Sequence, residues 1–125
     1  MKPGIKQVLG KTISGVVIAE NDDRPKMQMF LIFTDGSQLE FYSDDDFTCA
    51  NDLDHGGITR SIRYIESNAN NLRKISVITQ EEEISCTEDE KVTPKERKKL
   101  FVKSYQLFRD KLVLKGLLPK QPTKH

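Results

Sequence analysis

The chain has 125 residues, of which 36% are hydrophobic and 31% are charged, and its formal net charge is +1. This length and composition indicate one globular domain that can bury its own core. No apolar run approaches the roughly 18 residues of a membrane span, and residues 1–15 lack the apolar core of a signal peptide, so we expect a cytoplasmic protein without membrane contact.

The N-terminal third of the chain predicts an antiparallel meander of three strands. Residues 1–7 are expected to form a polar arm. A segment rich in β-branched residues at 12–20 predicts the first strand, and Gly15 within it indicates a bulge or a close backbone contact. Two further apolar runs predict strands at 27–34 and 38–42.

Asp35-Gly36 joins the second and third of these strands. Asp-Gly between apolar runs predicts a two-residue hairpin with a type I′ turn, because that turn needs φ > 0 at both central residues. The strand before the turn is apolar almost throughout, so we expect both of its faces to be covered. The strand after it alternates apolar and polar residues from Leu39 to Tyr42, as an outer strand with one wet face does.

The middle of the chain predicts one short helix between a polar loop and two further strands. Residues 43–57 show few signals of regular structure. Isoleucines then recur at i, i+4 and i+7, which predicts a helix over 57–67. An alternating segment at 72–79 predicts a fourth strand, and 84–87 predicts a short fifth strand at a sheet edge.

The last element carries clear boundary signals. Thr93-Pro94-Lys95-Glu96 is a capping box with proline at the first helical position, and Gly116 is suited to end a helix, so we expect a helix over about 94–115. Apolar residues at helical spacing predict a buried stripe. The stripe consists of Phe101, Tyr105, Phe108 and Leu112, widened by Leu100, Leu107 and Leu114.

Together these elements predict an α+β domain over residues 1–118, followed by a disordered tail at 119–125. The expected architecture is a mainly antiparallel sheet of four to five strands with one short helix and a long C-terminal helix. The cysteines, Cys49 and Cys86, lack metal-ligand spacing and are expected to be thiols in a reducing compartment, with a single disulfide as the alternative.

Charge is divided unevenly along the chain. Residues 1–92 hold 10 Lys or Arg and 17 Asp or Glu, which is −7, whereas residues 93–125 hold 10 and 2, which is +8. An acidic body followed by a basic helix indicates docking within the chain, docking between chains, or binding of an anion. The alternative is that each half is solvated independently.

Catalytic signatures are missing from the sequence, so we expect a protein that is not an enzyme and needs no cofactor. The chain has no Gly-rich phosphate loop, no GxSxG and no HExxH. His55 has no partner at a catalytic spacing. The acidic loop at 44–54 offers oxygen ligands for Ca²⁺ or Mg²⁺, but its spacing matches no EF-hand, and a solvated loop is the simpler interpretation.

The candidate ligand site lies at the start of the short helix. Gly56-Gly57 would leave N–H groups at the positive end of the helix dipole, although an ordinary flexible helix entry is the alternative. A phosphate bound there would be contacted by nearby cations, while Tyr105 or Phe47 stacks on a base. The predicted ligand-binding residues are Gly56, Gly57, Arg60, Arg63, Lys103, Tyr105 and Arg109.

Two stretches within residues 11–118 carry a resemblance, namely FTDGSQLEFYSDDDFTCANDLDHGG and the helical KSYQLFRDK. They resemble phage-encoded anti-defence proteins, in particular the Thoeris anti-defence sponge family, which sequesters cyclic ADP-ribose-type signalling nucleotides at a dimer interface. The resemblance implies an oligomeric nucleotide sponge that counters host defence. It matches none of the family's binding residues one by one, so the site above depends on the anion-pocket argument.

The sequence therefore predicts a non-enzymatic binding protein for a small phosphate-bearing signalling nucleotide, of the cyclic ADP-ribose or cyclic oligonucleotide type. We expect a homo-oligomer formed through the C-terminal helix. The alternative is a protein-interaction module or inhibitor whose basic helix docks an acidic protein partner. Nucleic acid is the weakest option, because the acidic body would repel a long polyanion.

Overall fold

The computed structural model describes residues 3–23, 25–43, 46–50, 52–68, 72–88 and 93–120, which form seven strands and three helices. The strands are β1 (Ile13–Asn21), β2 (Met27–Phe33), β3 (Ser37–Ser43), β4 (Phe47–Cys49), β5 (Asp54–His55), β6 (Leu72–Thr79) and β7 (Glu83–Thr87). The helices are α1 (Pro3–Gln7), α2 (Gly57–Asn68) and α3 (Pro94–Leu114).

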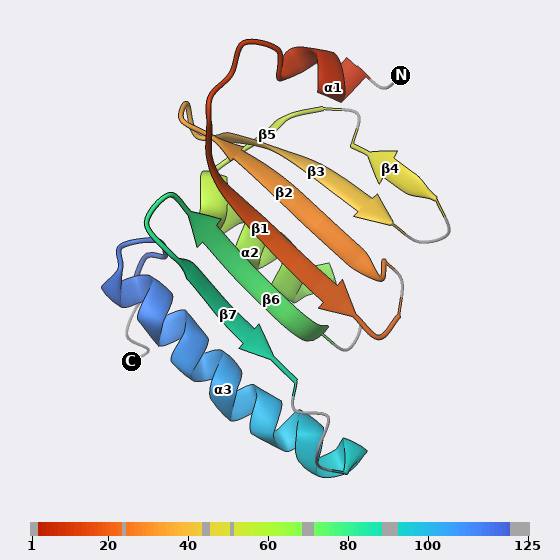
Figure 1. Ribbon diagram of the computed structural model, residues 1–125, viewed down its shortest axis with the longest axis vertical. Coiled ribbons are helices and arrows are strands. Elements are labelled where there is room, and N and C mark those ends of the chain that lie inside the picture. The colour runs from red at the N-terminus through yellow and green to blue at the C-terminus, as the bar shows by residue number, and fades with distance from the viewer. Residues whose placement is uncertain are drawn as a thin grey trace.

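All seven strands belong to one antiparallel sheet with the order β4-β3-β2-β1-β6-β7, and β5 pairs with β3 beside β4 (Figure 1). The predicted α+β class, the β1-β2-β3 meander, the short helix and the edge strand β7 are confirmed. The sheet has more strands than the four or five predicted, because β4 and β5 lie in the segment 43–57 that was expected to be a loop.

The short strands form because β3 offers them a free edge. Cys49 pairs with Phe41, and the Ala50 N–H donates to the Glu40 carbonyl at 2.8 Å. β3 is therefore an inner strand, and the prediction that it is an outer one is wrong. Strands of two or three residues are stabilised by pairing with their neighbour rather than by their own periodicity.

The β2–β3 turn differs from the predicted two-residue type I′ hairpin. The Gly36 N–H donates to the Phe33 carbonyl at 3.0 Å, which places Thr34 and Asp35 at the centre of the turn. Gly36 follows with φ +86°. This arrangement is a three-residue loop that ends on a left-handed glycine, a common alternative for hairpins. The Asp35 side chain stabilises it by accepting from the Ser37 N–H at 2.9 Å.

Helices α2 and α3 cover one face of the sheet (Figure 1). α2 lies behind the central strands, and α3 runs along β7 at the edge. The side chains that meet between the helices and this face form the main core. Its members include Val17, Ala19, Phe30, Ile62, Ile65, Ile75, Val77, Phe101, Phe108 and Leu112.

The opposite face is covered only in part by the described residues. Residues 1–7 were expected to be a loose arm, but α1 begins at Pro3, and Ile5 from it packs near Phe33 and Leu39. Farther along β2, Met27 is 47% exposed, whereas its neighbour Gln28 is buried. The expectation that both faces of β2 are covered is therefore wrong at the Met27 end of the strand, where alternate residues point to a part of the face that α1 does not cover.

Helix α3 begins and ends as its sequence predicts. The Thr93 hydroxyl accepts from the Glu96 N–H at 3.3 Å, Pro94 is in the first turn, and Gly116 follows the helix with φ +76°. Among the described residues, the reciprocal bond of a full capping box, from Thr93 N–H to the Glu96 carboxylate, is not made. The Thr93 hydroxyl is therefore the side chain that caps the start of α3, and it satisfies the Glu96 N–H.

Replacing Thr93 by alanine is expected to lower the free energy of unfolding by about 1 kcal/mol, because the Glu96 N–H loses its acceptor. Urea unfolding followed by circular dichroism measures the change. Ser104→Ala, in the exposed middle of the same helix, is the control and should stabilise slightly through helix propensity alone. Equal effects of the two substitutions would contradict a capping role.

The buried stripe of α3 is narrower than predicted. Phe101, Phe108 and Leu112 are buried and Tyr105 is partly buried, as expected. Three other apolar residues point to solvent instead: Leu100, Leu107 and Leu114 are 44%, 70% and 86% exposed. Successive residues of a helix are about 100° apart, so a residue next to a buried one leaves the interface.

The two cysteines lie on opposite faces of the sheet and are not joined by a disulfide. Cys86 belongs to the core under the helices, whereas Cys49 packs with the cluster beneath α1. Burial raises the pKa of the Cys86 thiol.

In the described part of the chain, no helix has the length and apolar character needed to cross a membrane. Of the predicted tail at 119–125, residues 121–125 lie outside the described residues.

Candidate functional site

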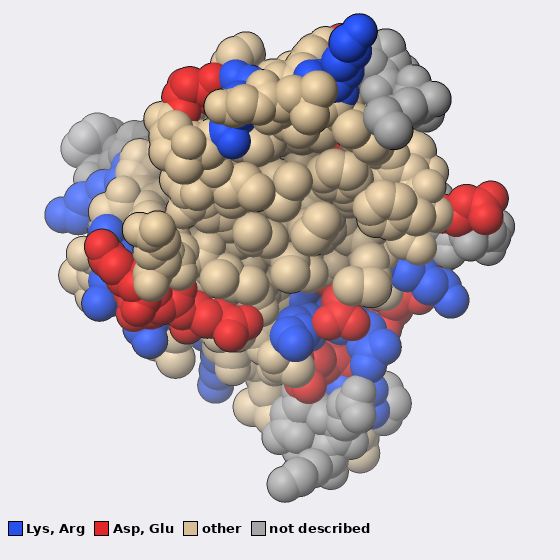
Figure 2. Space-filling view, turned by 45° about the horizontal axis from the view of Figure 1, so that its top comes forward, with Lys and Arg blue, Asp and Glu red and all other residues tan. Residues whose placement is uncertain are grey.

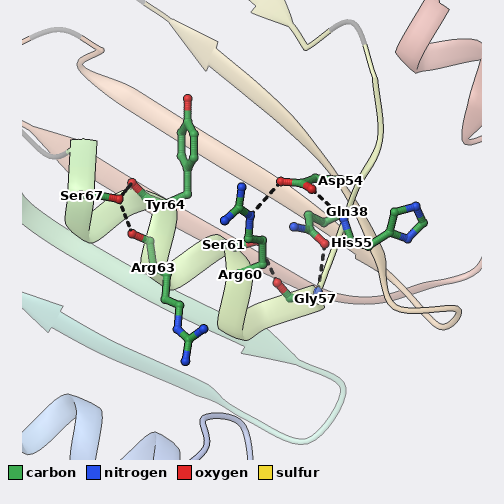
Figure 3. A network of polar contacts seen from close by, with 9 residues as sticks. All are labelled: Gln38, Asp54, His55, Gly57, Arg60, Ser61, Arg63, Tyr64 and Ser67. Atoms are coloured by element: carbon green, nitrogen blue, oxygen red, sulfur yellow. Dashed lines mark hydrogen bonds and ion pairs between the residues drawn. The ribbon is translucent and has the colours of Figure 1, made fainter. Parts of the chain in front are cut away.

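A pocket of about 220 Å³ lies between β3 and α2, next to the predicted helix-entry site. Arg60 and Tyr64 reach it from successive turns of α2, on the side that faces Asp54 (Figure 3). The Phe30 and Tyr64 rings meet edge to face at 6.0 Å between centroids. The pocket is lined by Phe30, Gln38, Glu40, Ala50, Asp52, Leu53, Asp54, Arg60 and Tyr64.

Glu40 is the most unusual group of this pocket. Its Oε2 accepts from Gln28 Nε2 at 3.0 Å, and Gln28 Oε1 in turn accepts from Asn21 Nδ2 at 3.3 Å. Burial raises the pKa of Glu40, and the bond from Gln28 offsets only part of that effect. A carboxylate that is costly to ionise and faces a cavity is a common mark of a functional site.

Substituting Glu40 by glutamine is expected to stabilise the protein at neutral pH but not under acid conditions. Because the folded-state pKa is raised, Glu40 contributes stability that is complete below the unfolded pKa and is lost as pH rises through the folded pKa. The gain for Glu40→Gln at pH 7 is expected to be less than about 1 kcal/mol, since water screens this half-exposed group.

Thermal unfolding of both proteins between about pH 4 and pH 7 measures that difference, with Glu81→Gln as the exposed control. The melting-temperature difference should grow with pH for Glu40→Gln. For the control it should stay constant. A constant difference for both variants would show that the Glu40 carboxylate is not penalised by burial.

The Gly56-Gly57 amides are already bonded within the chain. Both N–H groups donate to the Gly36 carbonyl at 3.1 Å, and the Gly57 N–H also donates to Gln38 Oε1 at 2.9 Å (Figure 3). Both glycines have positive φ, and a Cβ on Gly56 would lie 2.7 Å from Arg60 Cβ. The tight connection from β5 to α2 therefore accounts for this glycine pair without an anion.

The two arginines of α2 leave the helix in opposite directions (Figure 3). Arg60 Nε bonds Asp54 Oδ2 at 3.0 Å, and this contact lowers the pKa of Asp54. Arg63 is exposed and forms no ion pair with any described residue. Of the two predicted arginines, Arg60 therefore lies at the pocket and Arg63 points away from it.

The predicted residues of α3 form a separate group. The Tyr105 hydroxyl donates to Glu66 Oε2 at 2.7 Å, and Arg109 Nη1 pairs with the same oxygen. The pKa of Tyr105 is raised, first by burial and then by the Glu66 contact. Glu66 thus already neutralises the cation that was expected to bind a ligand. Lys103 is exposed and has no ion-pair partner among the described side chains.

Phe47, the other candidate for stacking on a base, is on the far side of the sheet from the pocket. It pairs in register with Ser43 and stacks on Phe41 at 5.5 Å between ring centroids. Glu40 is next to Phe41 in the strand and therefore points to the opposite face. The structure does not bring Phe47 to the Gly56–Arg60 region.

Several cations of the basic C-terminal segment form ion pairs with carboxylates of the acidic body. Lys98 Nζ lies 2.9 Å from Asp22 Oδ2 and 2.8 Å from Glu88 Oε2. Burial lowers the pKa of Lys98, but the bonds to these two carboxylates outweigh it and raise the pKa overall. Arg97 also pairs with Glu88, and Lys115 pairs with Glu82, at 3.3 Å each. Arg97 and Lys98 at the start of α3, and Lys115 just after its end, therefore hold the helix on the acidic body.

The outer side of α3 carries a second apolar surface, which we call the leucine ridge and define by Leu100, Leu107 and Leu114. Their spacing of seven residues aligns them along one line of the helix. Lys103 and Lys111 lie between successive leucines in sequence and are exposed. An exposed apolar line flanked by cations is suited to bind an amphipathic segment with acidic edges.

Glu40 and Tyr64 line the pocket but are not among the residues predicted from the sequence. The alternation of β3 assigned Glu40 to the wet face, and that face is instead covered by α2. Tyr64 could have been found, because it is four residues after Arg60 and therefore on the same side of the helix. No group of three or more metal-ligating side chains occurs in the described ranges, and Asp44, Asp45 and Asn51 of the predicted acidic loop fall outside them.

Comparison with protein-family models, curated proteins and solved structures finds no significant match to the chain. The pocket holds three carboxylates and one paired guanidinium, a balance that favours hydrogen-bond donors over a free phosphate. The leucine ridge has the cationic surroundings that the pocket lacks.

Proposed function

We propose that the chain is a non-enzymatic binding protein whose C-terminal helix docks an acidic, amphipathic helix of a partner protein. The leucine ridge carries this proposal. Leu107 and Leu114 are 70% and 86% exposed in a helix whose other side is already anchored to the core. An exposed apolar line costs solubility without adding stability, so its regular spacing indicates a binding surface.

Charge supports an acidic partner rather than a basic one. The cations on the inner side of α3 are paired with Asp22, Glu66, Glu82 and Glu88, whereas the exposed lysines beside the ridge have no ion-pair partner in the described part of the chain. Acidic residues at the edges of a docked helix would pair with these lysines and fix its register. The exposed lysines are Lys99, Lys103 and Lys111.

The test is affinity capture with the full chain from cells that produce it, followed by cross-linking at lysine and mass spectrometry. We expect a partner whose acidic segment is cross-linked to Lys103 or Lys111. Leu107→Lys should reduce its recovery at least tenfold, because about 2 kcal/mol of leucine burial is lost. Glu81→Gln, an exposed change elsewhere, should leave recovery unchanged.

Retention of the partner by Leu107→Lys would overturn this proposal. Cross-links confined to other surfaces would do the same. The melting temperature of the variant should match that of the parent protein, because residue 107 is 70% exposed. The loss of binding can then be assigned to the surface rather than to unfolding.

A second candidate function is sequestration of a small nucleotide, as the resemblance of the sequence implies. The pocket beside Arg60 supports it, because about 220 Å³ with two aromatic walls accommodates a base. Glu40 would accept from the amino groups of that base. Arg60 would have to leave Asp54 to contact a phosphate.

Thermal shift with ADP-ribose, its cyclic derivative and cyclic dinucleotides tests this second candidate. A ligand at 100 times its Kd stabilises the folded state by about 2.7 kcal/mol, which should raise the melting temperature by several degrees. Arg60→Ala should abolish the shift, whereas Arg63→Ala, on the other side of the helix, should retain it. No shift with any of these compounds would exclude tight binding of this ligand class.

A further inference from the structure

The sheet face opposite α2 carries a broad apolar surface. Figure 2 shows that the centre of this face lacks Lys, Arg, Asp and Glu, which gather at its margins. We call this surface the open face, and its main side chains are Val16, Ile18, Met29, Phe41, Phe47 and Ile78. An antiparallel sheet face that meets water is normally polar.

The strand register explains how these side chains come together. Ile18 pairs with Met29, and Met29 with Phe41, so three apolar residues form a row over β1, β2 and β3. The same row continues as Ser76 in β6 and Ser85 in β7, whose hydroxyls bond to each other at 2.9 Å. Val16 lies between Ile78 and Leu31 in the next row. Charged residues on this face occur at its edges, where Glu83 pairs with Ile78 and Lys74 pairs with Glu20.

The open face has both a projection and a hollow. Phe47 is 70% exposed and stacks on Phe41. Beside this ring is an apolar depression of about 160 Å³, to which Ile18, Met27 and Met29 contribute. A patch that meets a copy of itself across a two-fold axis must be self-complementary, and a ring beside a ring-sized hollow satisfies that requirement.

We propose that the open face is the interface of a homodimer, in which two copies pack face to face as a two-layer sandwich. The missing charge at its centre favours a second copy over a charged peptide or a nucleic acid, because homodimer interfaces are the more apolar class. The whole face, with six strands about 4.8 Å apart and roughly 20 Å long, spans roughly 600 Å², and α1 covers one end of it. The open part is therefore at the small end of stable interfaces, which typically bury ~800 Å² per partner.

This dimer differs from the one predicted from the sequence. A helix–helix dimer through Phe101, Tyr105, Phe108 and Leu112 would need side chains that pack within the chain. The sandwich uses the other side of the sheet. It leaves α3 and its leucine ridge exposed, so the dimer and the docking of a partner are independent.

Sedimentation velocity of the full chain from roughly 1 to 100 µM tests the proposal. We expect a mass of twice 14.3 kDa for the parent protein. Phe47→Ser and Met29→Lys should each give a mass of 14.3 kDa, because one removes the projecting ring and the other places a charge in the central row. Leu107→Lys, the control on the leucine ridge, should remain dimeric.

Phe47→Ser keeps the test valid if Met29→Lys fails to fold, since Phe47 is exposed at the sheet edge. Circular dichroism confirms that each variant is folded. A parent protein that stays monomeric at 100 µM would overturn the proposal. A folded Phe47→Ser variant that remains dimeric would also overturn it. A dimer that is dissociated only by Leu107→Lys would overturn it as well, because the two copies would then be in contact through α3.

Discussion

Replacing Phe108 by alanine is expected to lower the free energy of unfolding by about 4 kcal/mol, the usual cost of removing a buried phenyl ring. Phe108 is 4% exposed, packs in the core between α3 and the sheet, and lies 5.6 Å from the Tyr105 ring. Urea unfolding of both proteins gives the difference directly.

Leu107→Ala is the matched control for this prediction. The two residues are adjacent, but Leu107 is 70% exposed, so its truncation should change the free energy of unfolding by less than about 0.5 kcal/mol. The ratio of the two effects measures how α3 is rotated about its axis. Comparable losses would mean that the leucine ridge is part of the core and is not a binding surface.

Helices α2 and α3 and the long strands could be predicted because their signals are local. The isoleucines of α2 and the Thr93 cap and Gly116 stop of α3 act within one or two helical turns of the residues they affect. β4 and β5 could not be predicted, because they have three and two residues and depend on pairing with β3. The position of the β2–β3 turn is predicted correctly, but its loop has three residues instead of the predicted two.

The site was harder to predict because its contacts are distant in sequence. Glu66 meets Tyr105 and Arg109 across 39 and 43 positions, and no spacing rule connects them. The Gly56-Gly57 signal was correctly located at a helix start. Its cause, however, is a tight connection capped by Gln38, which lies in β3. A glycine pair alone does not distinguish backbone geometry from ligand binding.

The uneven charge of the chain has the most direct structural explanation at Glu88, which sits just after β7. Its side chain is 4% exposed, and it accepts contacts from both Lys98 and Arg97. Asp22, which directly follows β1, offers a second carboxylate to the same Lys98 ammonium group. The acidic body therefore holds the start of the basic helix through one buried carboxylate and one exposed one.

Glu88→Ala is accordingly expected to destabilise the protein by about 3 kcal/mol, the low end for breaking a buried ion pair, because Lys98 keeps some access to water. Asp22→Ala removes the other partner of the same lysine, yet it should cost less than about 1 kcal/mol, since Asp22 is 39% exposed. Measuring the free energy of unfolding in low and high salt distinguishes the two variants further, because salt screens only the exposed Asp22–Lys98 pair. If both variants lost the same small amount, the helix would be held by its apolar side alone. The cations of its first turn would then be available to a partner, and the docking surface would extend beyond the leucine ridge.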